Sequence, residues 1–259
     1  MNQLPTRSLA EQWHVKTVLL LILFVLMILQ TASIVGATGE FNWDEFGVIW
    51  KQMFNPDWSY MMVIIPAILQ TIQMALVGTL LGAVFALPIS LLASNNIVTN
   101  PIMRGAVRFI LNIVRAIPEM LLAAVFVAIV GIGPMAGVLA VAIFSFGMIS
   151  KLFYEAIETI DEGPLEALTA SGANMPQKIT FAIIPQVMNQ FASYFLYALE
   201  INIRSSTVLG YVGAGGVGLY LEQTMSMFRY DRTIVVVMGI LVVVILVDAL
   251  SNYLREALS

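Results

Sequence analysis

The stretch that decides the fold is Glu155-Ala-Ile-Glu-Thr-Ile-Asp-Glu-Gly-Pro-Leu-Glu-Ala-Leu-Thr-Ala-Ser-Gly-Ala-Asn-Met-Pro176, between two long apolar runs. It carries five of the sixteen acidic residues of the chain. Charged side chains are costly in hydrocarbon. We therefore expect this stretch to be a loop in water between two membrane spans.

The same stretch contains the start and stop signals of a short helix. Pro164 suits the first position of a helix, and the acidic residues just before it favour a helix N-terminus. Gly172 can adopt the left-handed conformation that ends a helix, and Pro176 suits the start of the next one. The sequence predicts an exposed helix over about residues 165–171, which would be a docking surface.

The composition on both sides of this loop is that of a membrane protein. Hydrophobic residues make up 59% of the 259 residues and charged residues 11%, with a mean hydropathy of +0.90. Soluble domains have about a quarter charged residues. The chain has no cysteine and one histidine, His14, which makes it a poor candidate for a metal centre or a histidine-based catalyst. It has no basic tract that would indicate nucleic-acid binding.

The apolar runs predict an all-α polytopic membrane protein with about six transmembrane helices. We expect the spans at about 17–35, 61–93, 118–132, 136–160, 179–209 and 233–250. We divide the chain into residues 1–60 (tail, first span and outer segment) and a core, residues 61–259. Residues 37–60 mix aromatic and acidic residues, which suits either an amphipathic segment at the outer interface or a plain loop.

Positive charges orient the spans with both termini in the cytoplasm. The lysines and arginines expected inside are Arg7, Lys16, Arg104, Arg108, Arg115, Lys151, Lys178 and Arg255. The smaller group expected outside, or in the outward half of the fifth span, is Lys51, Arg204, Arg229 and Arg232. The acidic loop then lies on the cytoplasmic side, and Asp248 lies at the cytoplasmic end of the last span. Arg115 and Glu119 could form a gate or an interfacial anchor.

Small residues in the second span, Gly78, Gly82 and Ala86, recur every four positions and predict a close helix contact. Gly213, Gly215 and Gly218 match G-x-G-x-x-G. A nucleotide site needs a strand before this motif, whereas here both neighbours are expected membrane helices, so we reject that function. The glycines instead predict a tight re-entrant turn near the outer face.

The fifth span carries a polar stripe. Its members are spaced by three or four residues, which places them on one helix face: Gln186, Gln190, Ser193, Tyr197, Glu200 and Arg204. A polar stripe facing lipid is expensive, so we expect it to face a passage or a polar helix–helix contact. Glu200 and Arg204 can pair, and Arg204 could instead attract an anion on the route.

Glu166-Ala-Leu-Thr-Ala-Ser-Gly172, followed by Ile184-Pro185, resembles the E-A-A-x-x-x-G loop of membrane subunits of bacterial ABC importers. Leu168 stands in place of the second alanine of that motif. The runs Ser150-Lys-Leu-Phe-Tyr-Glu-Ala-Ile-Glu158 and Arg204-Ser-Ser-Thr-Val-Leu-Gly210, with Gly213-Ala-Gly-Gly-Val-Gly218, are similar to the phosphonate or phosphite branch.

This resemblance implies a type I ABC importer permease core in the bacterial cytoplasmic membrane, with a cytoplasmic coupling helix that inserts into an ATPase subunit. The residues implied in coupling are Pro164, Glu166, Ala167, Leu168, Gly172 and Pro185. The polar stripe would line the translocation pathway for a small anionic substrate, phosphonate or a related phosphorus oxyanion.

The implied partners are a separate ATP-binding subunit, a second copy of this chain and a periplasmic or extracellular solute-binding protein. The chain has no G-x-x-x-x-G-K-[ST] motif, so we expect it to be no enzyme and to bind no cofactor, with ATP and Mg on the ATPase. Two alternatives stay open. The chain could be a permease for another solute (methionine, phosphite or an organophosphate ester), or an energy-independent channel.

Overall fold

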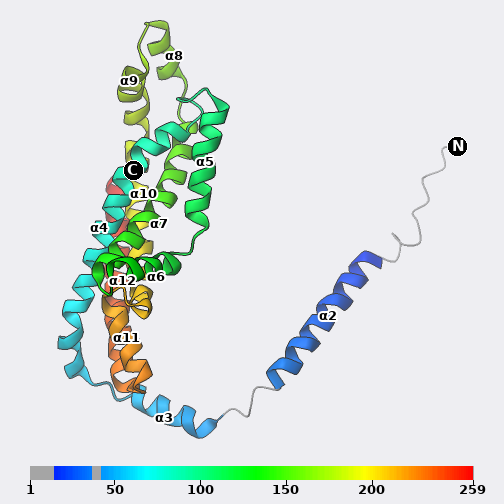
Figure 1. Ribbon diagram of the computed structural model, residues 1–259, viewed down its shortest axis with the longest axis vertical. Helices are drawn as coiled ribbons and strands as arrows, with labels where there is room; N and C mark the ends of the chain where they lie inside the picture. Colours follow the sequence, from blue (N-terminus) through cyan, green and yellow to red (C-terminus); the bar gives the residue numbers. More distant parts are fainter. Residues whose placement is uncertain (1–14, 37–41, 259) are drawn as a thin grey trace, which may run out of the picture. The chain divides into compact units, whose positions relative to one another are not determined.

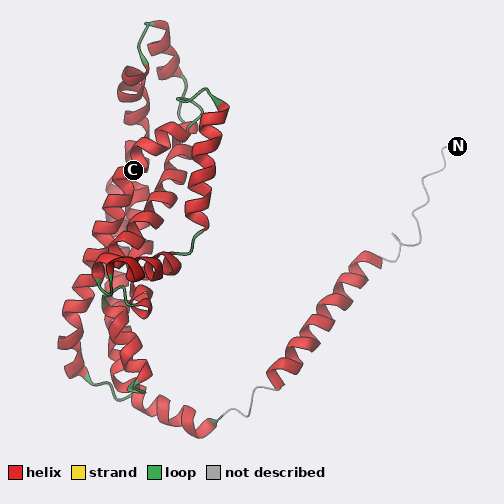
Figure 2. Ribbon diagram, in the orientation of Figure 1, coloured by secondary structure: helices red, strands yellow, loops and turns green. Residues whose placement is uncertain are grey.

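The computed structural model describes residues 15–36 and 42–258, and every element in these ranges is a helix (Figure 2). The N-terminal tail with Arg7 and His14 lies outside the described residues. The elements are α2 (Val15–Gly36), α3 (Trp43–Met53), η1 (Trp58–Tyr60), α4 (Met61–Ala93), α5 (Pro101–Ala116), α6 (Glu119–Val130), α7 (Pro134–Glu158), α8 (Gly163–Ala170), α9 (Met175–Lys178), the π-turn η2 (Ile179–Ile183), α10 (Ile184–Leu209), η3 (Gly210–Val212), α11 (Val217–Ser226) and α12 (Tyr230–Leu258).

The chain divides into two compact units, residues 1–48 and 49–259. In the first unit, α2 is the apolar helix expected at 17–35, and its side chains from Val18 to Leu29 are exposed. The predicted division at residue 60 stays a prediction, as does an interfacial position for residues 37–60.

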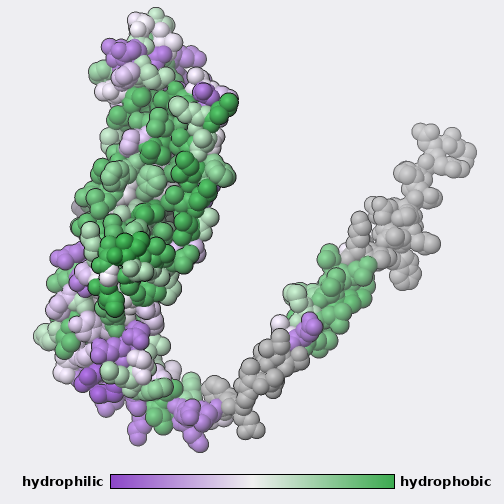
Figure 3. All heavy atoms as spheres, viewed as in Figure 1, coloured by the Kyte–Doolittle hydropathy of each residue, from purple (hydrophilic) through white to green (hydrophobic). Residues whose placement is uncertain are grey.

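The second unit is built around the long helices α4, α7, α10 and α12 (Figure 1). Its surface is hydrophobic over the middle of its length and more hydrophilic at the two ends (Figure 3). Within the described residues, three stretches are long and apolar enough to cross a membrane: Trp58–Ala93, Pro134–Glu158 and Tyr230–Ala257. The predicted all-α membrane fold is confirmed. The count of six spans stays a prediction.

The third predicted span, at 118–132, agrees with α6 to within two residues at each end. Helix α6 has only 12 residues, or ~18 Å, and α5 precedes it with a bend of 84° between the two. Residues 101–116, expected as part of a cytoplasmic connection, form α5, an amphipathic helix packed along α7. Pro118 explains the break, because proline disfavours helical backbone at the residue before it, and Ile117 is extended.

Close contact between α4 and α7 forms the centre of this unit. A Cβ atom on Gly78 would lie 2.7 Å from Val141, and one on Gly82 would lie 2.6 Å from the carbonyl oxygen of Ala142. Neither position has room for a side chain, so the two helix backbones can approach closely. The predicted small-residue contact is confirmed, within one chain.

An ion pair closes the end of the bundle where α12 begins. The Arg232 Nε donates to the Asp57 Oδ2 at 3.1 Å, and the guanidinium lies 4.9 Å from the ring centre of Tyr60. Hydrogen bonds from Ser59 and from Arg232 hold the pKa of the Asp57 carboxyl below its usual value. These contacts tie the segment before α4 to the start of α12.

Candidate functional site

The acidic loop forms two short helices, α8 and α9, at one end of the second unit (Figure 1). Pro164 lies in the first turn of α8, as predicted, and Glu166 adds negative charge to that turn. Gly172 has φ +81°. The amide of Ala173 donates to the Leu168 carbonyl at 2.9 Å, and that of Gly172 donates to Thr169 at 3.1 Å. This is a Schellman ending, and it confirms the expected helix stop.

A capping box begins α9. The Asn174 side chain accepts from the Gln177 amide at 3.0 Å, and the Gln177 side chain accepts from the Asn174 amide at 2.8 Å. Pro176 follows in the first turn, as predicted. Every residue of the connection between α8 and α9 therefore has a defined backbone conformation, which gives the loop a fixed shape before any partner binds.

The side chains expected to dock are on the surface. Pro164, Glu166, Ala167 and Gly172 are exposed, and Leu168 is half-buried. Leu165, which the sequence did not single out, packs against a buried cluster of Phe153, Ile157, Ile183 and Val187. The signal in the sequence that could have predicted this contact was the apolar Leu165 within an acidic stretch. This contact fixes α8 to the helical bundle.

A polar cleft of about 660 Å³ runs beside α8. It is lined by Asn95, Asn96, Glu162, Leu165, Glu166, Thr169 and Ala170. The connection from α4 to α5 forms the opposite wall, where the Asn96 side chain donates to the Ile157 carbonyl at 2.8 Å. The exposed end of α8 thus offers a negatively charged surface next to a hollow, which suits a protein partner with basic groups.

Gln186, predicted as the first member of the polar stripe, instead forms hydrogen bonds with the loop that precedes α8. Its Oε1 accepts from the Asp161 amide at 3.0 Å, and its Nε2 donates to the Asp161 carbonyl at 3.3 Å. Pro185, in the first turn of α10, is exposed beside it. These two bonds join the start of α10 to the residues just before α8, so Gln186 positions the loop that carries α8.

The rest of the predicted stripe divides into two parts. Gln190 and Tyr197 are exposed and Ser193 is half-buried, which leaves them open toward a passage or a partner. Glu200 accepts from Arg255 of α12 at 2.7 Å, so this part of the stripe contributes to a helix–helix contact.

Arg204 belongs to the same contact. Its guanidinium lies 3.4 Å from Asp248 and 3.7 Å from Glu200, although it is 56% exposed. The sequence placed Arg204 outward and Asp248 at the cytoplasmic end, and this pair shows that both positions cannot hold. Arg204 lies in the second half of α10 and Asp248 in the second half of α12, so the contact joins these two parts of the helices.

A buried polar cluster was missed by the sequence analysis. Asn202 is fully buried, and its Nδ2 donates to the Thr79 hydroxyl at 2.7 Å and to the Ser145 hydroxyl at 2.6 Å. The three residues come from α10, α4 and α7. Asn202 lies on the opposite face of α10 from Arg204, so the stripe did not include it. A single asparagine in an apolar face was the only available signal.

The glycine-rich run after α10 forms the predicted turn. Gly213, Gly215 and Gly216 have φ between +75° and +86°, and the Gly213 carbonyl accepts from the Gly133 amide at 2.9 Å. From α4, Gln70 accepts from the Gly216 amide at 3.0 Å, while Thr71 accepts from Val217 at 2.8 Å. The turn lies between η3 and α11 and packs on helices on both sides.

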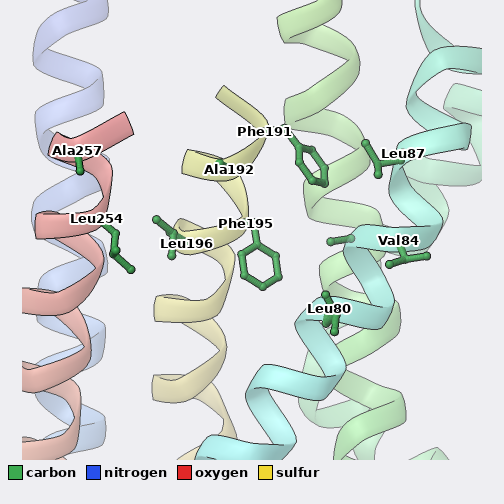
Figure 4. Close-up of a pocket in the computed structure, with 10 residues that line it drawn as sticks. Leu80, Val84, Leu87, Phe191, Ala192, Phe195, Leu196, Leu254 and Ala257 are labelled. Carbon is green, nitrogen blue, oxygen red and sulfur yellow. The ribbon is translucent and has the colours of Figure 1, made fainter. Parts of the chain in front are cut away.

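A second hollow, about 510 Å³, has an almost entirely apolar lining (Figure 4). Side chains of α4, α10 and α12 point toward it, among them Leu80, Phe195 and Leu254. It offers no polar group to orient a solute, so it is not a candidate for binding a small anion.

The comparisons with known proteins agree on one family. Residues 78–259 match the family of binding-protein-dependent transport system inner membrane components. The phosphite transport system permease protein PtxC of Stutzerimonas stutzeri is 41% identical over 201 residues, which are 78% of this chain and 73% of the relative. The putative cryptic phosphonate transport system permease protein PhnE2 of Escherichia coli K12 is 44% identical over 118 residues, 46% of this chain and 97% of the relative.

Among solved structures, the inward-facing MetNI methionine ABC transporter has a chain that matches with a TM-score of 0.70. The match covers 78% of this chain and 98% of that chain at 24% sequence identity, so it concerns the fold alone. The helical loop, the polar residues of α10 and the matched sequence lead to one conclusion: this chain belongs to the family of binding-protein-dependent transport system inner membrane components.

Proposed function

We propose that this chain is the permease subunit of an ATP-driven importer for phosphite, phosphonate or a related phosphorus oxyanion. The observation that carries the proposal is the 41% identity to a phosphite transport system permease across most of both chains. The phosphonate permease relative supports the same class of solute. The methionine transporter shares the fold, but its low identity gives no support for methionine as the substrate.

In this proposal, α8 is the coupling helix that binds a separate ATPase subunit. Glu166 would pair with basic groups of the ATPase, while Ala167 and Leu168 would lie against its surface. Gly172 and Pro164 would set the length of the helix, and Pro185 would begin the following span. The exposed surface of α8, its Schellman ending at Gly172 and its fixation by Leu165 and Gln186 support this role, because a preorganised surface loses little conformational entropy on binding.

The remaining partners follow from the same proposal. Two copies of the chain would enclose the pathway, with Gln190, Ser193 and Tyr197 facing the solute. A solute-binding protein would deliver the oxyanion at the other end of the bundle. ATP and Mg would be bound by the ATPase, and both termini would be cytoplasmic.

The test is ATP-driven uptake by the complete complex, reconstituted in liposomes with its ATPase and binding protein. We expect uptake of phosphite or methylphosphonate, and none of methionine. Uptake of methionine without uptake of any phosphorus oxyanion would overturn the proposed substrate. Uptake that does not require ATP would overturn the importer and favour a channel.

A further inference from the structure

Arg115 is the charged residue at the end of α5, just before the 84° bend into α6, and it is exposed. Among the arginines in the described part of the chain, it is the one with no hydrogen bond or ion pair. The others have the following partners: Arg104 with Val98, Arg108 with Glu158, Arg204 with Asp248, Arg229 with Asp231, Arg232 with Asp57 and Arg255 with Glu200.

The packing of α5 along α7 gives the depth of Arg115. The two helices run antiparallel, with Arg108 paired to Glu158 at the end of α7. Further along, the Cγ atom of Arg115 would lie 2.9 Å from a Cβ atom on Gly147. Gly147 is ~16 Å from Glu158 along the helix, at ~1.5 Å per residue. Because hydrocarbon is ~30 Å thick, an α7 that spans it places Arg115 close to the middle, and not on the cytoplasmic side where the sequence analysis placed it.

The glycine at position 147 leaves space for the side chain of Arg115. Gly147 is buried, and a side chain there would collide with the aliphatic stem of Arg115. The stem therefore lies against α7 where a larger residue would displace it. A charged arginine at the middle of a bilayer costs at least ~2.5 kcal/mol when it faces lipid. Such a residue must face water, a counter-charge or a solute.

No carboxylate of the described chain neutralises Arg115. Glu119, the nearest in sequence, lies beside the Ser205 hydroxyl of α10, and its Oε1 is buried without a hydrogen-bond partner. Arg204, which the sequence favoured as the anion-attracting residue, is held between Asp248 and Glu200. The free positive charge at mid-depth is thus on α5 and not on α10.

We propose that Arg115 binds the oxyanion of the solute as it passes the middle of the translocation pathway. This rests on the proposed function. A guanidinium offers a planar fork of donors that matches two oxygens of a phosphorus oxyanion. A lipid phosphate stays at the membrane surface. The depth of Arg115 therefore excludes a lipid headgroup as its ligand.

The first experiment asks whether Arg115 faces water. Since the chain contains no cysteine, Arg115→Cys gives each copy of this chain a single thiol, and labelling is read on this subunit after the subunits of the complex are separated. We expect a charged, water-soluble thiol reagent to label it. Ile113→Cys, at the same depth on the apolar face of α5, is the matched control and should stay unlabelled. Absence of labelling at Arg115→Cys, or equal labelling at both positions, would overturn the proposal.

The second experiment measures uptake of phosphite and methylphosphonate by the reconstituted complex. Arg115→Ala should lower uptake at least tenfold while basal ATP hydrolysis is kept, and Arg115→Lys should restore a large part of it. Arg104→Ala should stay within twofold of the unaltered chain. Uptake by Arg115→Ala within twofold would overturn this inference alone, whereas no oxyanion uptake by the unaltered complex would overturn the proposed function.

Discussion

At the scale of single residues, Gly172 sets the end of α8. Its φ of +81° is strained for a β-branched residue by roughly 1–2 kcal/mol, although a Cβ there would meet nothing within 4 Å. We expect Gly172→Val to abolish substrate-stimulated ATP hydrolysis while the complex still assembles. Gly172→Asn should be milder, because asparagine tolerates this conformation. Full stimulation in Gly172→Val would contradict a docking role for α8.

Asn202 is the residue whose side chain joins α10 to α4 and α7. Hydrogen bonds between membrane helices contribute ~0.6 kcal/mol on average, so Asn202→Ala should destabilise the protein by roughly 1–2 kcal/mol once lost packing is included. The measurement is thermal unfolding in detergent. The control is Asn112→Ala, because Asn112 is exposed on α5, and it should change stability by less than about 0.5 kcal/mol. Equal effects at the two positions would argue against the buried cluster.

At the scale of elements, the contact between α4 and α7 leaves no room for a side chain. Gly82→Leu should destabilise the fold by about 1–3 kcal/mol or prevent assembly, because its Cβ would lie 2.6 Å from the Ala142 carbonyl oxygen. Gly105→Ala on α5 meets nothing within 4 Å and should be tolerated or slightly stabilising. Thermal unfolding of the two purified variants measures the difference, and a tolerated Gly82→Leu would contradict the close helix contact.

The joint between α10 and the loop gives a second test at this scale. Gln186→Ala removes both bonds to Asp161, so we expect substrate-stimulated ATP hydrolysis to fall severalfold with basal hydrolysis retained. Gln190→Ala, one turn along, leaves the loop intact and should act on uptake alone. If Gln186→Ala lowers uptake without changing the stimulation of the ATPase, Gln186 faces the solute after all.

Much of the fold follows from the sequence at this scale, because long apolar runs and helix-ending residues are local signals. The bounds of α4 and the stop at Gly172 were predicted in this way. Tertiary contacts were not predicted: α5 packs along α7, and Glu200 and Arg204 lie against α12. Spacing along one helix identifies a shared face, but it cannot say which helix covers that face. The pairing of Glu200 with Arg204 was therefore predicted correctly, whereas their partners on α12 were not.

At the scale of the whole molecule, Arg204 and Asp248 connect two long helices. Arg204→Ala leaves Asp248 unpaired in the membrane region, so we expect a loss of stability and an equal slowing of dianionic and neutral solutes. The double variant Arg204→Ala with Asp248→Asn should regain most of the stability, because neither charge is then left alone. Preferential slowing of the dianion in Arg204→Ala would instead place this residue on the pathway.

The glycine turn after η3 provides a site where separation of two loops can be measured. The hydrogen bond between Gly133 and Gly213 unites two loops that are far apart in the chain, and main-chain atoms make the contact. Ile132 and Pro134 lie close to the glycine turn, and Ala214 within it is fully buried, so separating the two loops would break these packing contacts together with the hydrogen bond. Hydrogen–deuterium exchange at the Gly133 amide would therefore report how often the two loops separate during transport.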